Sequence, residues 1–199
     1  MDDLTAFILV GGKNTRMGSD KAFVELKGRT LLERALDTVR ALTPEAILVG
    51  ERAKFSSFGT VVEDVFRERG PLGGIHAALA ATATDLNLML AVDLPFVEAG
   101  FLKYLVRQAR GNEALVTVPK AAGGWQPLCA VYRKQFAPIA ERALQGGQNK
   151  VDALFAQIRT LVVDEADITR HGFSLAMFRN LNTPADVEQA KKQRTLPGK

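Results

Sequence analysis

Short apolar runs alternate along this chain with longer segments that have helical periodicity. Several of the runs are continuously apolar rather than alternating, which is typical of strands that are covered on both faces. The expected strands are Ala6–Val10, Ala46–Val49, Val61–Val62, Leu88–Val92, Leu115–Val118, Leu128–Tyr132 and Leu161–Val163.

Helix candidates fill the intervals between these strands. The final helix has the clearest start, with Thr183 as N-cap, Pro184 at the first helical position and Asp186 completing a capping box. The other expected helices are Thr30–Leu42, Leu72–Ala83, Glu98–Arg110, Phe136–Leu144 and Val151–Gln157.

This alternation predicts the α/β class, with three αβα layers and an open, mainly parallel sheet that contains a Rossmann-like nucleotide-binding half. Gly123-Gly124 lies between two expected strands and predicts a hairpin, and hence one antiparallel strand. The 199 residues suffice for one core, so we expect a single domain over residues 1–199.

The segment "LVGGKNTRMGSDK", Leu9–Lys21, follows the first expected strand, at the edge of the sheet where ligands bind. Its glycines allow a close backbone approach, and its cations suit phosphate oxygens. We therefore interpret Gly11, Gly12, Gly18, Arg16 and Lys21 as a polyphosphate loop, although a solvated β–α connection is the alternative. The spacing matches neither the Walker pattern nor the dinucleotide fingerprint.

The pattern G-G-x-x-x-R-M-G-x-D-K resembles the signature of the nucleotidyltransferases that act on molybdopterin. Its paired glycine resembles the form of the signature in the guanylyltransferase branch. The stretches "VVEDVFRERGPLGG", "LAVDLPFV", "QPLCAVYRK" and "NLNTPADV" agree in order, so the resemblance runs nearly end to end. It implies a nucleotidyltransferase (GT-A-like) fold and transfer of GMP from GTP to the phosphate of molybdopterin or the molybdenum cofactor. A cytidylyl or sugar-phosphate nucleotidylyltransferase and a non-catalytic nucleotide-binding regulatory module are the alternatives.

The resemblance also implies roles for individual residues. Lys21, Arg16 and Asp93 would be catalytic, and Asp93 would hold Mg²⁺, the expected cofactor. The nucleotide would contact Leu9, Val10, Gly11, Gly12, Lys21, Asp64 and Asp93. Asn182 would face the pterin.

Taken alone, the aspartates and the asparagine are less specific. Asp93 follows the apolar run Leu88–Val92, and Asp64 ends another expected strand, so both carboxylates belong at the carboxyl edge of the sheet. Each could instead shape a turn, and the same holds for Asn182.

Two positions depart from the family pattern. Val10 stands where alanine is usual, and Gly50 stands where an asparagine often touches the nucleotide. His76 and His171 accompany no nucleophile or metal pattern, so we expect a helix surface and a loop for them. The single Cys129 is expected to be a buried strand residue.

The net charge of +4 is mild and its cations are spread out, which favours a small anionic ligand over nucleic acid. The acidic start and the short first apolar run predict neither a signal peptide nor a membrane span. We expect a cytoplasmic monomer that uses GTP and molybdopterin and makes transient contact with cofactor-delivering proteins.

Overall fold

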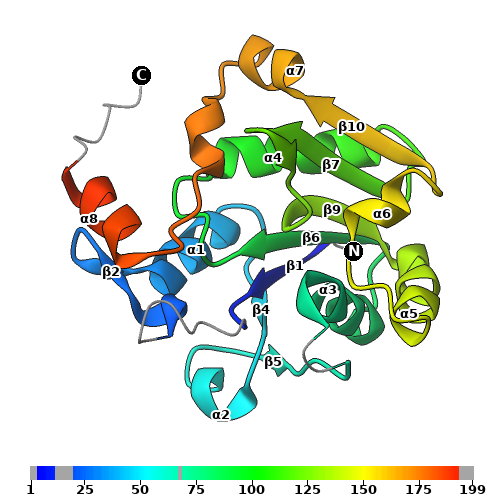
Figure 1. Ribbon diagram of the computed structural model, residues 1–199, viewed down its shortest axis with the longest axis horizontal. Helices are drawn as coiled ribbons and strands as arrows, with labels where there is room; N and C mark the ends of the chain where they lie inside the picture. The colour runs from blue at the N-terminus through cyan, green and yellow to red at the C-terminus, as the bar shows by residue number, and fades with distance from the viewer. Residues whose placement is uncertain (1–3, 12–19, 67–68, 193–199) are drawn as a thin grey trace.

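The computed structural model describes residues 4–11, 20–66 and 69–192 of the chain (Figure 1). Its strands are β1 (Leu4–Leu9), β2 (Glu25–Leu26), β3 (Arg29–Thr30), β4 (Ala46–Val49), β5 (Val61–Val62), β6 (Leu86–Ala91), β7 (Val116–Ala121), β8 (Gly124–Trp125), β9 (Cys129–Arg133) and β10 (Thr160–Asp164). Its α-helices are α1 (Leu31–Arg40), α2 (Arg52–Phe55), α3 (Gly70–Ala81), α4 (Ala99–Arg110), α5 (Ala137–Gln145), α6 (Asp152–Phe155), α7 (Glu165–Arg170) and α8 (Pro184–Lys192), and its short 3₁₀ helices are η1 (Lys21–Phe23), η2 (Lys134–Phe136) and η3 (Leu175–Phe178). None of the helices within these ranges has the length and apolar character needed to cross a membrane.

One sheet runs through the molecule in the order β10-β7-β9-β6-β1-β4-β5, with β8 paired to β7. β9 lies antiparallel between β6 and β7, whereas the β1–β4, β4–β5, β1–β6 and β7–β10 pairs are parallel. The open, mainly parallel sheet is therefore confirmed. β9 confirms the expected antiparallel strand, and the short β8, which is also antiparallel to β7, is an addition that the sequence analysis did not contain.

The sheet is the middle of three layers, because its strands send alternate side chains into two separate cores. On β1, Ala6 and Ile8 join the core beneath α1 and α4, whereas Phe7 and Leu9 join the core beneath α3 and α5. Burial of a side chain such as Ile8 stabilises the fold by about 1.5–3 kcal/mol. Continuous apolar strands are thus explained by helices on both faces.

Several short elements were not expected. β2 and β3 form a hairpin whose two turn residues, Lys27 and Gly28, have φ of 55° and 77°. These positive values are those of the turn that best suits a two-residue hairpin loop. α2 and α7 are too short to show a periodic apolar stripe, and the helix expected over Val151–Gln157 is only the four-residue α6.

The strand order creates a switch point between β1 and β6. From β1 the chain continues to β4 and β5 on one side and then returns to β6 on the other. The loops after β1 and β6 consequently flank one crevice, and Val92 N–H donates to Leu9 O at 3.1 Å across it. In open α/β sheets this crevice is where ligands bind.

Candidate functional site

Three residues that the sequence analysis singled out meet at the switch point. The Lys21 ammonium donates to Asp93 Oδ2 at 2.9 Å and to Asn182 Oδ1 at 2.6 Å. The side chains of Lys21 and Asp93 are only 20% and 23% exposed. Up to 161 residues of sequence separate these groups, so the fold assembles a charged cluster that no local segment could make.

Lys21 is held by the short helix η1. Asp20 is the N-cap of η1, and its Oδ1 accepts the Ala22 N–H at 3.2 Å. The Ala22 side chain is fully buried in the core, and η1 packs against α1. An aspartate directly before a helical turn is a common N-cap, so Asp20 had a sequence signal that the motif analysis did not use.

Asp93 and Asn182 are tied to each other through the backbone. Asp93 follows β6, and its carbonyl oxygen accepts the N–H of the buried Leu181 at 3.1 Å. The Asn182 N–H donates to Asp186 Oδ2 at 3.0 Å.

The expected capping box at the start of α8 is confirmed. The Thr183 hydroxyl and N–H both donate to Asp186 Oδ2 at 2.8 Å, and the Asp186 N–H donates back to the Thr183 hydroxyl at 3.2 Å. The Thr183 hydroxyl and the two backbone N–H groups lower the pKa of Asp186. The cap therefore orients the residue that contacts Lys21.

The first part of the expected phosphate loop is held to the end of β4 by backbone hydrogen bonds. Leu9 and Val10 are buried on opposite faces of the sheet, and Gly11 is exposed. The Val10 and Gly11 N–H groups both donate to Val49 O, at 3.1 and 3.2 Å. Gly12, Arg16 and Gly18 lie outside the described residues, so their expected roles stay predictions.

Asp64 lies on the other side of β1, beyond the end of β5. Its Oδ1 accepts the Phe66 N–H at 2.8 Å, and burial is the main cause that raises the pKa of this carboxyl. A Cβ at Gly73 would lie 2.5 Å from Asp64 Oδ2 and 2.9 Å from Phe66 O. Glycine at 73 thus allows the first turns of α3 to pack directly beneath Asp64.

His76 is not on a helix surface, and that expectation was wrong. It is 8% exposed, and its ring packs edge-on against Phe66 at 5.1 Å. Its Nδ1 is buried and has no hydrogen-bond partner among the described residues. The physical reason is that α3 is wedged between the sheet and α5, which buries the continuous run Leu72–Leu79 and leaves no polar face there.

The two departures from the family pattern touch each other. A Cβ at Gly50 would lie 2.7 Å from Val10 Cγ2 and 3.3 Å from the Phe55 ring. Real Cβ atoms do not tolerate the shorter of these distances. The larger side chain at 10 and the missing side chain at 50 are therefore sterically matched, a relation that neither residue reveals alone in the sequence.

The remaining expectations on side chains have clear outcomes. Cys129 is fully buried in β9, as expected, and burial raises the pKa of its thiol well above the usual range. Trp125 on β8, which the sequence analysis did not discuss, packs edge-on against Phe155 at 5.0 Å. His171 caps the end of α7, where its Nδ1 lies 2.8 Å from Asp167 O.

Among the described residues, the site offers too few ligands to coordinate a divalent cation fully, so a substrate would have to supply the others. The described residues contain no group of three or more histidine, cysteine, aspartate or glutamate side chains that could hold a metal. Asp93 contributes one accessible carboxylate at a strand end. Mg²⁺ commonly takes one or two carboxylates together with substrate phosphates and waters, so this donor set fits Mg²⁺ bound with a nucleotide.

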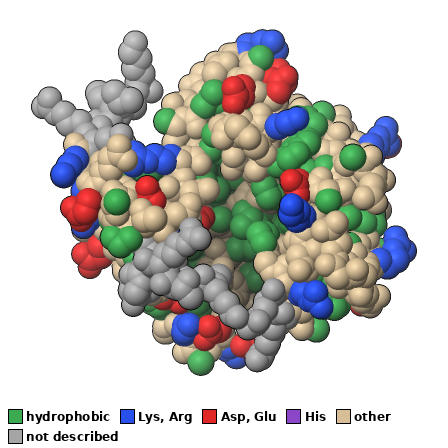
Figure 2. All heavy atoms as spheres, viewed as in Figure 1, with side chains coloured by type: hydrophobic (Ala, Val, Ile, Leu, Met, Phe, Trp, Pro, Cys, Tyr) green, Lys and Arg blue, Asp and Glu red, His purple; other side chains and the backbone are tan. Residues whose placement is uncertain are grey.

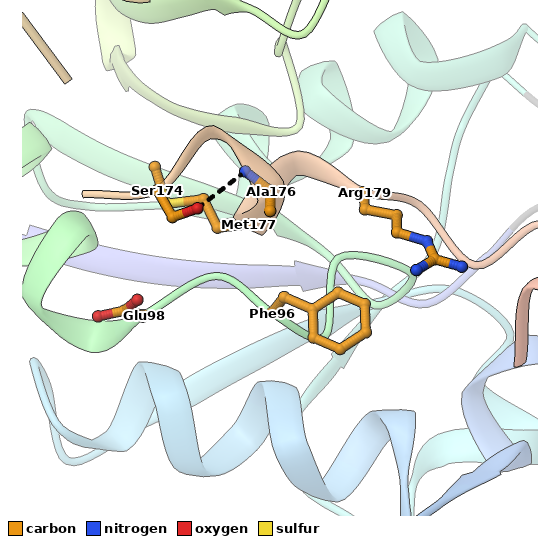
Figure 3. A pocket seen from close by; sticks show the side chains of 6 residues that line it. All are labelled: Phe96, Glu98, Ser174, Ala176, Met177 and Arg179. Atoms are coloured by element: carbon orange, nitrogen blue, oxygen red, sulfur yellow. Dashed lines mark hydrogen bonds between the residues drawn. The ribbon is translucent and has the colours of Figure 1, made fainter. Parts of the chain in front are cut away.

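A cavity of about 300 Å³ lies between the β6–α4 loop and the segment around η3 (Figure 3). It is lined by Phe96, Glu98, Ser174, Ala176, Met177 and Arg179, from the β6–α4 loop and the segment around η3. Figure 2 also shows the broader face of the molecule, which is hollowed and floored by hydrophobic side chains. Sequence reasoning missed the cavity because its two walls lie about eighty residues apart and carry no motif.

Comparisons with known proteins agree with this fold. A family model described as the MobA-like NTP transferase domain matches residues 6–161. The molybdenum cofactor guanylyltransferase of Desulfosudis oleivorans is 31% identical over 194 residues, which cover 96% of each chain. The probable molybdenum cofactor guanylyltransferase of Carboxydothermus hydrogenoformans is 30% identical and covers 96% of this chain and 97% of its own length.

Solved structures give the same result. Molybdopterin-guanine dinucleotide biosynthesis protein A from Archaeoglobus fulgidus superposes with a TM-score of 0.83 at 27% identity and covers 94% of this chain and 97% of that chain. The 4-diphosphocytidyl-2C-methyl-D-erythritol synthase of Anaerococcus prevotii has a TM-score of 0.69 at 18% identity, with 94% of both chains covered. The second likeness shows the fold alone.

Proposed function

The chain belongs to the MobA-like NTP transferase family, and we propose that it transfers GMP from GTP to the terminal phosphate of molybdopterin or the molybdenum cofactor. The observation that carries this proposal is the contact of Lys21 with both Asp93 and Asn182 at the switch point of the sheet. The relatives named as guanylyltransferases supply the substrate pair.

The reaction is a direct displacement at phosphorus. An oxygen of the acceptor phosphate bonds to the α-phosphorus of GTP, and the bond between the α-phosphorus and its bridging oxygen to the β-phosphate breaks. Pyrophosphate leaves with that electron pair. A phosphate is already ionised near neutral pH, so the step needs no side-chain base, and the protein acts through alignment and charge neutralisation.

Lys21 is suited to the charge that develops on the leaving pyrophosphate. An ammonium group carries three N–H donors, so one remains beyond the bonds to Asp93 and Asn182. We assign the same task to Arg16 in the loop outside the described residues. The backbone of Gly11 and Gly12 would hold the other phosphate oxygens, for which the Gly11 N–H would exchange its 3.2 Å bond to Val49 O for one to phosphate.

Asp93 would hold Mg²⁺, which neutralises phosphate charge when it is bound together with the nucleotide. Asp64 would accept hydrogen bonds from the ribose hydroxyls or from the N–H edge of guanine. Its raised pKa does not prevent this role, because a carboxyl oxygen accepts hydrogen bonds in either protonation state.

Pyrophosphate release tests the substrate pair. With Mg²⁺ present, we expect release from GTP only when molybdopterin, with or without molybdenum, is added. ATP and UTP should be poor, because their base edges leave the groups of a guanine pocket without partners. Chelation of Mg²⁺ should stop the reaction.

Other outcomes would redirect the proposal. A preference for CTP would place the protein with cytidylyltransferases and keep the mechanism. Release with a sugar phosphate but not with the pterin would refute the acceptor, and GTP binding without product from any acceptor would favour a regulatory module.

We also propose that the reaction takes place in the cytoplasm and that the protein works as a monomer in transient contact with cofactor-delivering proteins.

A further inference from the structure

A second cavity lies along α4, farther from the transfer site than the cavity beside Phe96. Its volume is about 220 Å³, and it lies between α4 and the chain that follows α7 (Figure 1). β6 and β7 are parallel to each other, since each is antiparallel to β9, so α4 leads back from the carboxyl edge of the sheet. Arg107 therefore lies about 12 Å along the helix axis from Ala99, in the direction away from Asp93. We call this the α4 cavity, and its lining residues are Gly100, Lys103, Tyr104, Arg107, His171 and Phe173.

The two cations of the α4 cavity have no anionic partner. Lys103 and Arg107 lie four residues apart on the same face of α4, and both are exposed. Within the described part of the chain, neither side chain forms an ion pair or a hydrogen bond. The Arg107 guanidinium lies over the Tyr104 ring, 5.6 Å from its centroid. Because like charges at this spacing repel, an anion bound between them would relieve an unfavourable interaction.

Tyr104 offers a third hydrogen-bond donor. It is 5% exposed, and the centroid of its ring lies 4.4 Å from that of the His171 ring and 5.9 Å from that of the Phe173 ring. Its hydroxyl has no hydrogen-bond partner among the described residues and is not fully buried, so it is open to a bound molecule. Burial is the main cause that raises the pKa of this phenol, which keeps its O–H available as a donor near neutral pH.

The acids near the cavity are engaged with other groups. Asp167 pairs with Arg170 at 2.9 Å, and Asp164 Oδ1 accepts the Asp167 N–H at 2.8 Å. His171 Nδ1 donates to Asp167 O at 2.8 Å, so this ring can donate from Nε2 only when it is protonated. None of the described residues that line the α4 cavity carries a carboxylate. The cavity is therefore positively charged and rich in donors.

We propose that the α4 cavity binds the phosphate group of a small molecule, at a site separate from the transfer site. The Arg107 guanidinium and the Lys103 ammonium contact its oxygens, and the Tyr104 hydroxyl donates a third hydrogen bond. A planar guanidinium fork suits two oxygens of one phosphate, and the dianion has further acceptor capacity for the other donors. The inference does not depend on the transfer reaction, because none of these residues has a role in it.

A phosphate fits this donor set better than a carboxylate does. A carboxylate has two oxygens and a single charge, whereas a phosphate monoester has three terminal oxygens and a charge near −2 at neutral pH. Three donors and two cations are therefore matched by the phosphate. The volume of about 220 Å³ also leaves room for a substituent the size of a sugar.

Calorimetric titration of the full chain measures phosphate binding directly. The titrations use Lys21→Ala protein, in which the transfer site has lost its ammonium group, and sodium chloride holds the ionic strength constant. The probes are orthophosphate, pyrophosphate and ribose 5-phosphate, and all three should bind. Tightest binding of ribose 5-phosphate identifies an organic phosphate as the source, whereas tightest binding of pyrophosphate identifies the product of the proposed transfer.

Substitutions in the cavity show where the phosphate lies. Arg107→Ala and Lys103→Ala, each added to Lys21→Ala, should weaken orthophosphate binding about tenfold, since each removes hydrogen bonds to a charged group. Tyr104→Phe keeps the buried ring and removes only the hydroxyl, and should weaken binding about threefold. Arg142→Ala on α5 removes another exposed cation and is the matched control, with unchanged binding expected. Circular dichroism confirms that each variant is folded.

Thermal unfolding gives an independent measure, because a ligand that binds only the folded state raises Tm. At ten times its dissociation constant, orthophosphate should raise the Tm of the Lys21→Ala protein by about 3–6 °C. At the same concentration, the further double replacement Lys103→Ala and Arg107→Ala should leave a shift below about 1 °C.

Three results would refute the proposal. If the variants of Lys103, Arg107 and Tyr104 bind all three phosphates as tightly as the Arg142→Ala control, phosphate does not occupy the α4 cavity. If sodium chloride at the same ionic strength produces the same Tm shift, charge screening explains the shift and there is no site. If a glutamate-rich peptide binds in a manner that depends on Arg107 while none of the phosphates binds, the cavity docks an acidic protein segment instead.

Discussion

Replacement of Gly50 by alanine should destabilise the protein, and replacement of Val10 should rescue it. The new Cβ would lie 2.7 Å from Val10 Cγ2 and 3.3 Å from the buried Phe55 ring. A β-branched valine has little freedom to move its methyl groups away. Overpacking of this kind costs about 1–3 kcal/mol, and the loss of glycine flexibility in the unfolded chain returns only about 0.4–1 kcal/mol. We expect Gly50→Ala to lower the free energy of unfolding by about 1–2 kcal/mol.

Val10→Ala alone should also be destabilising, because it removes two buried methyl groups at about 0.8 kcal/mol each. In the double variant, the methyl group at 50 occupies part of the space that Val10 vacates. The double variant should therefore cost less than the sum of the single variants, with a favourable coupling energy of about 1 kcal/mol or more.

Urea unfolding of the four proteins in this cycle measures the coupling, provided that the denaturant slope stays constant. Gly100→Ala is the matched control, since a Cβ there meets only Phe173, at an ordinary 3.5 Å, within α4. It should stabilise the protein by about 0.5–1 kcal/mol. Strict additivity of Val10→Ala and Gly50→Ala would refute the steric match, and so would a Gly50→Ala variant that is as stable as the Gly100→Ala control.

Three further predictions concern the site. Lys21→Ala and Asp93→Ala should each reduce pyrophosphate release at least about a hundredfold while the circular dichroism spectrum stays native. The control variant Lys191→Ala should be fully active, and normal turnover in either site variant would contradict the assigned roles. Asn182→Ala should lower kcat about tenfold, since Lys21 loses an acceptor, and should raise KM for molybdopterin more than KM for GTP; equal changes in both KM values with kcat intact would indicate a purely structural asparagine. Burial raises the pKa of Asp64, so its ionisation lowers the stability of the folded protein as pH rises through the folded pKa. Asp64→Asn should therefore raise Tm at about pH 7, show no gain at about pH 3, and bind GTP more weakly. A lower Tm at about pH 7 would disprove this reasoning.

The parts of the structure that local pattern determines could be predicted from the sequence. Apolar runs such as Leu88–Val92 identified the strands, because two helical layers bury both faces of the sheet. The strand-end rule also predicted that Lys21 and Asp93 lie in one crevice, and their side chains are in contact there. The cap at Thr183 and Asp186 was predictable for the same reason, since its hydrogen bonds close within a single turn.

The features that failed depend on tertiary contacts. The burial of His76 follows from the packing of α3 against α5. The apolar residues all around α3 were a signal for this burial that the sequence analysis did not use. The Val10–Gly50 contact joins the ends of two neighbouring strands, and the cavity beside Phe96 joins a loop to a distant 3₁₀ helix. Each pairing depends on how segments distant in the sequence are placed in three dimensions, which the local sequence pattern does not specify.

The fate of the α-phosphate of GTP is the most direct measurement of the proposed chemistry. GTP radiolabelled at the α-phosphate would be incubated with Mg²⁺, molybdopterin and the protein, and the products would be separated by chromatography. A parallel reaction would carry the label at the γ-phosphate. We predict that the α-label appears in a pterin–guanine dinucleotide and that the γ-label appears in pyrophosphate, in equal amounts. Release of the α-label as GMP or GDP, with no label on the pterin, would contradict transfer to the acceptor phosphate.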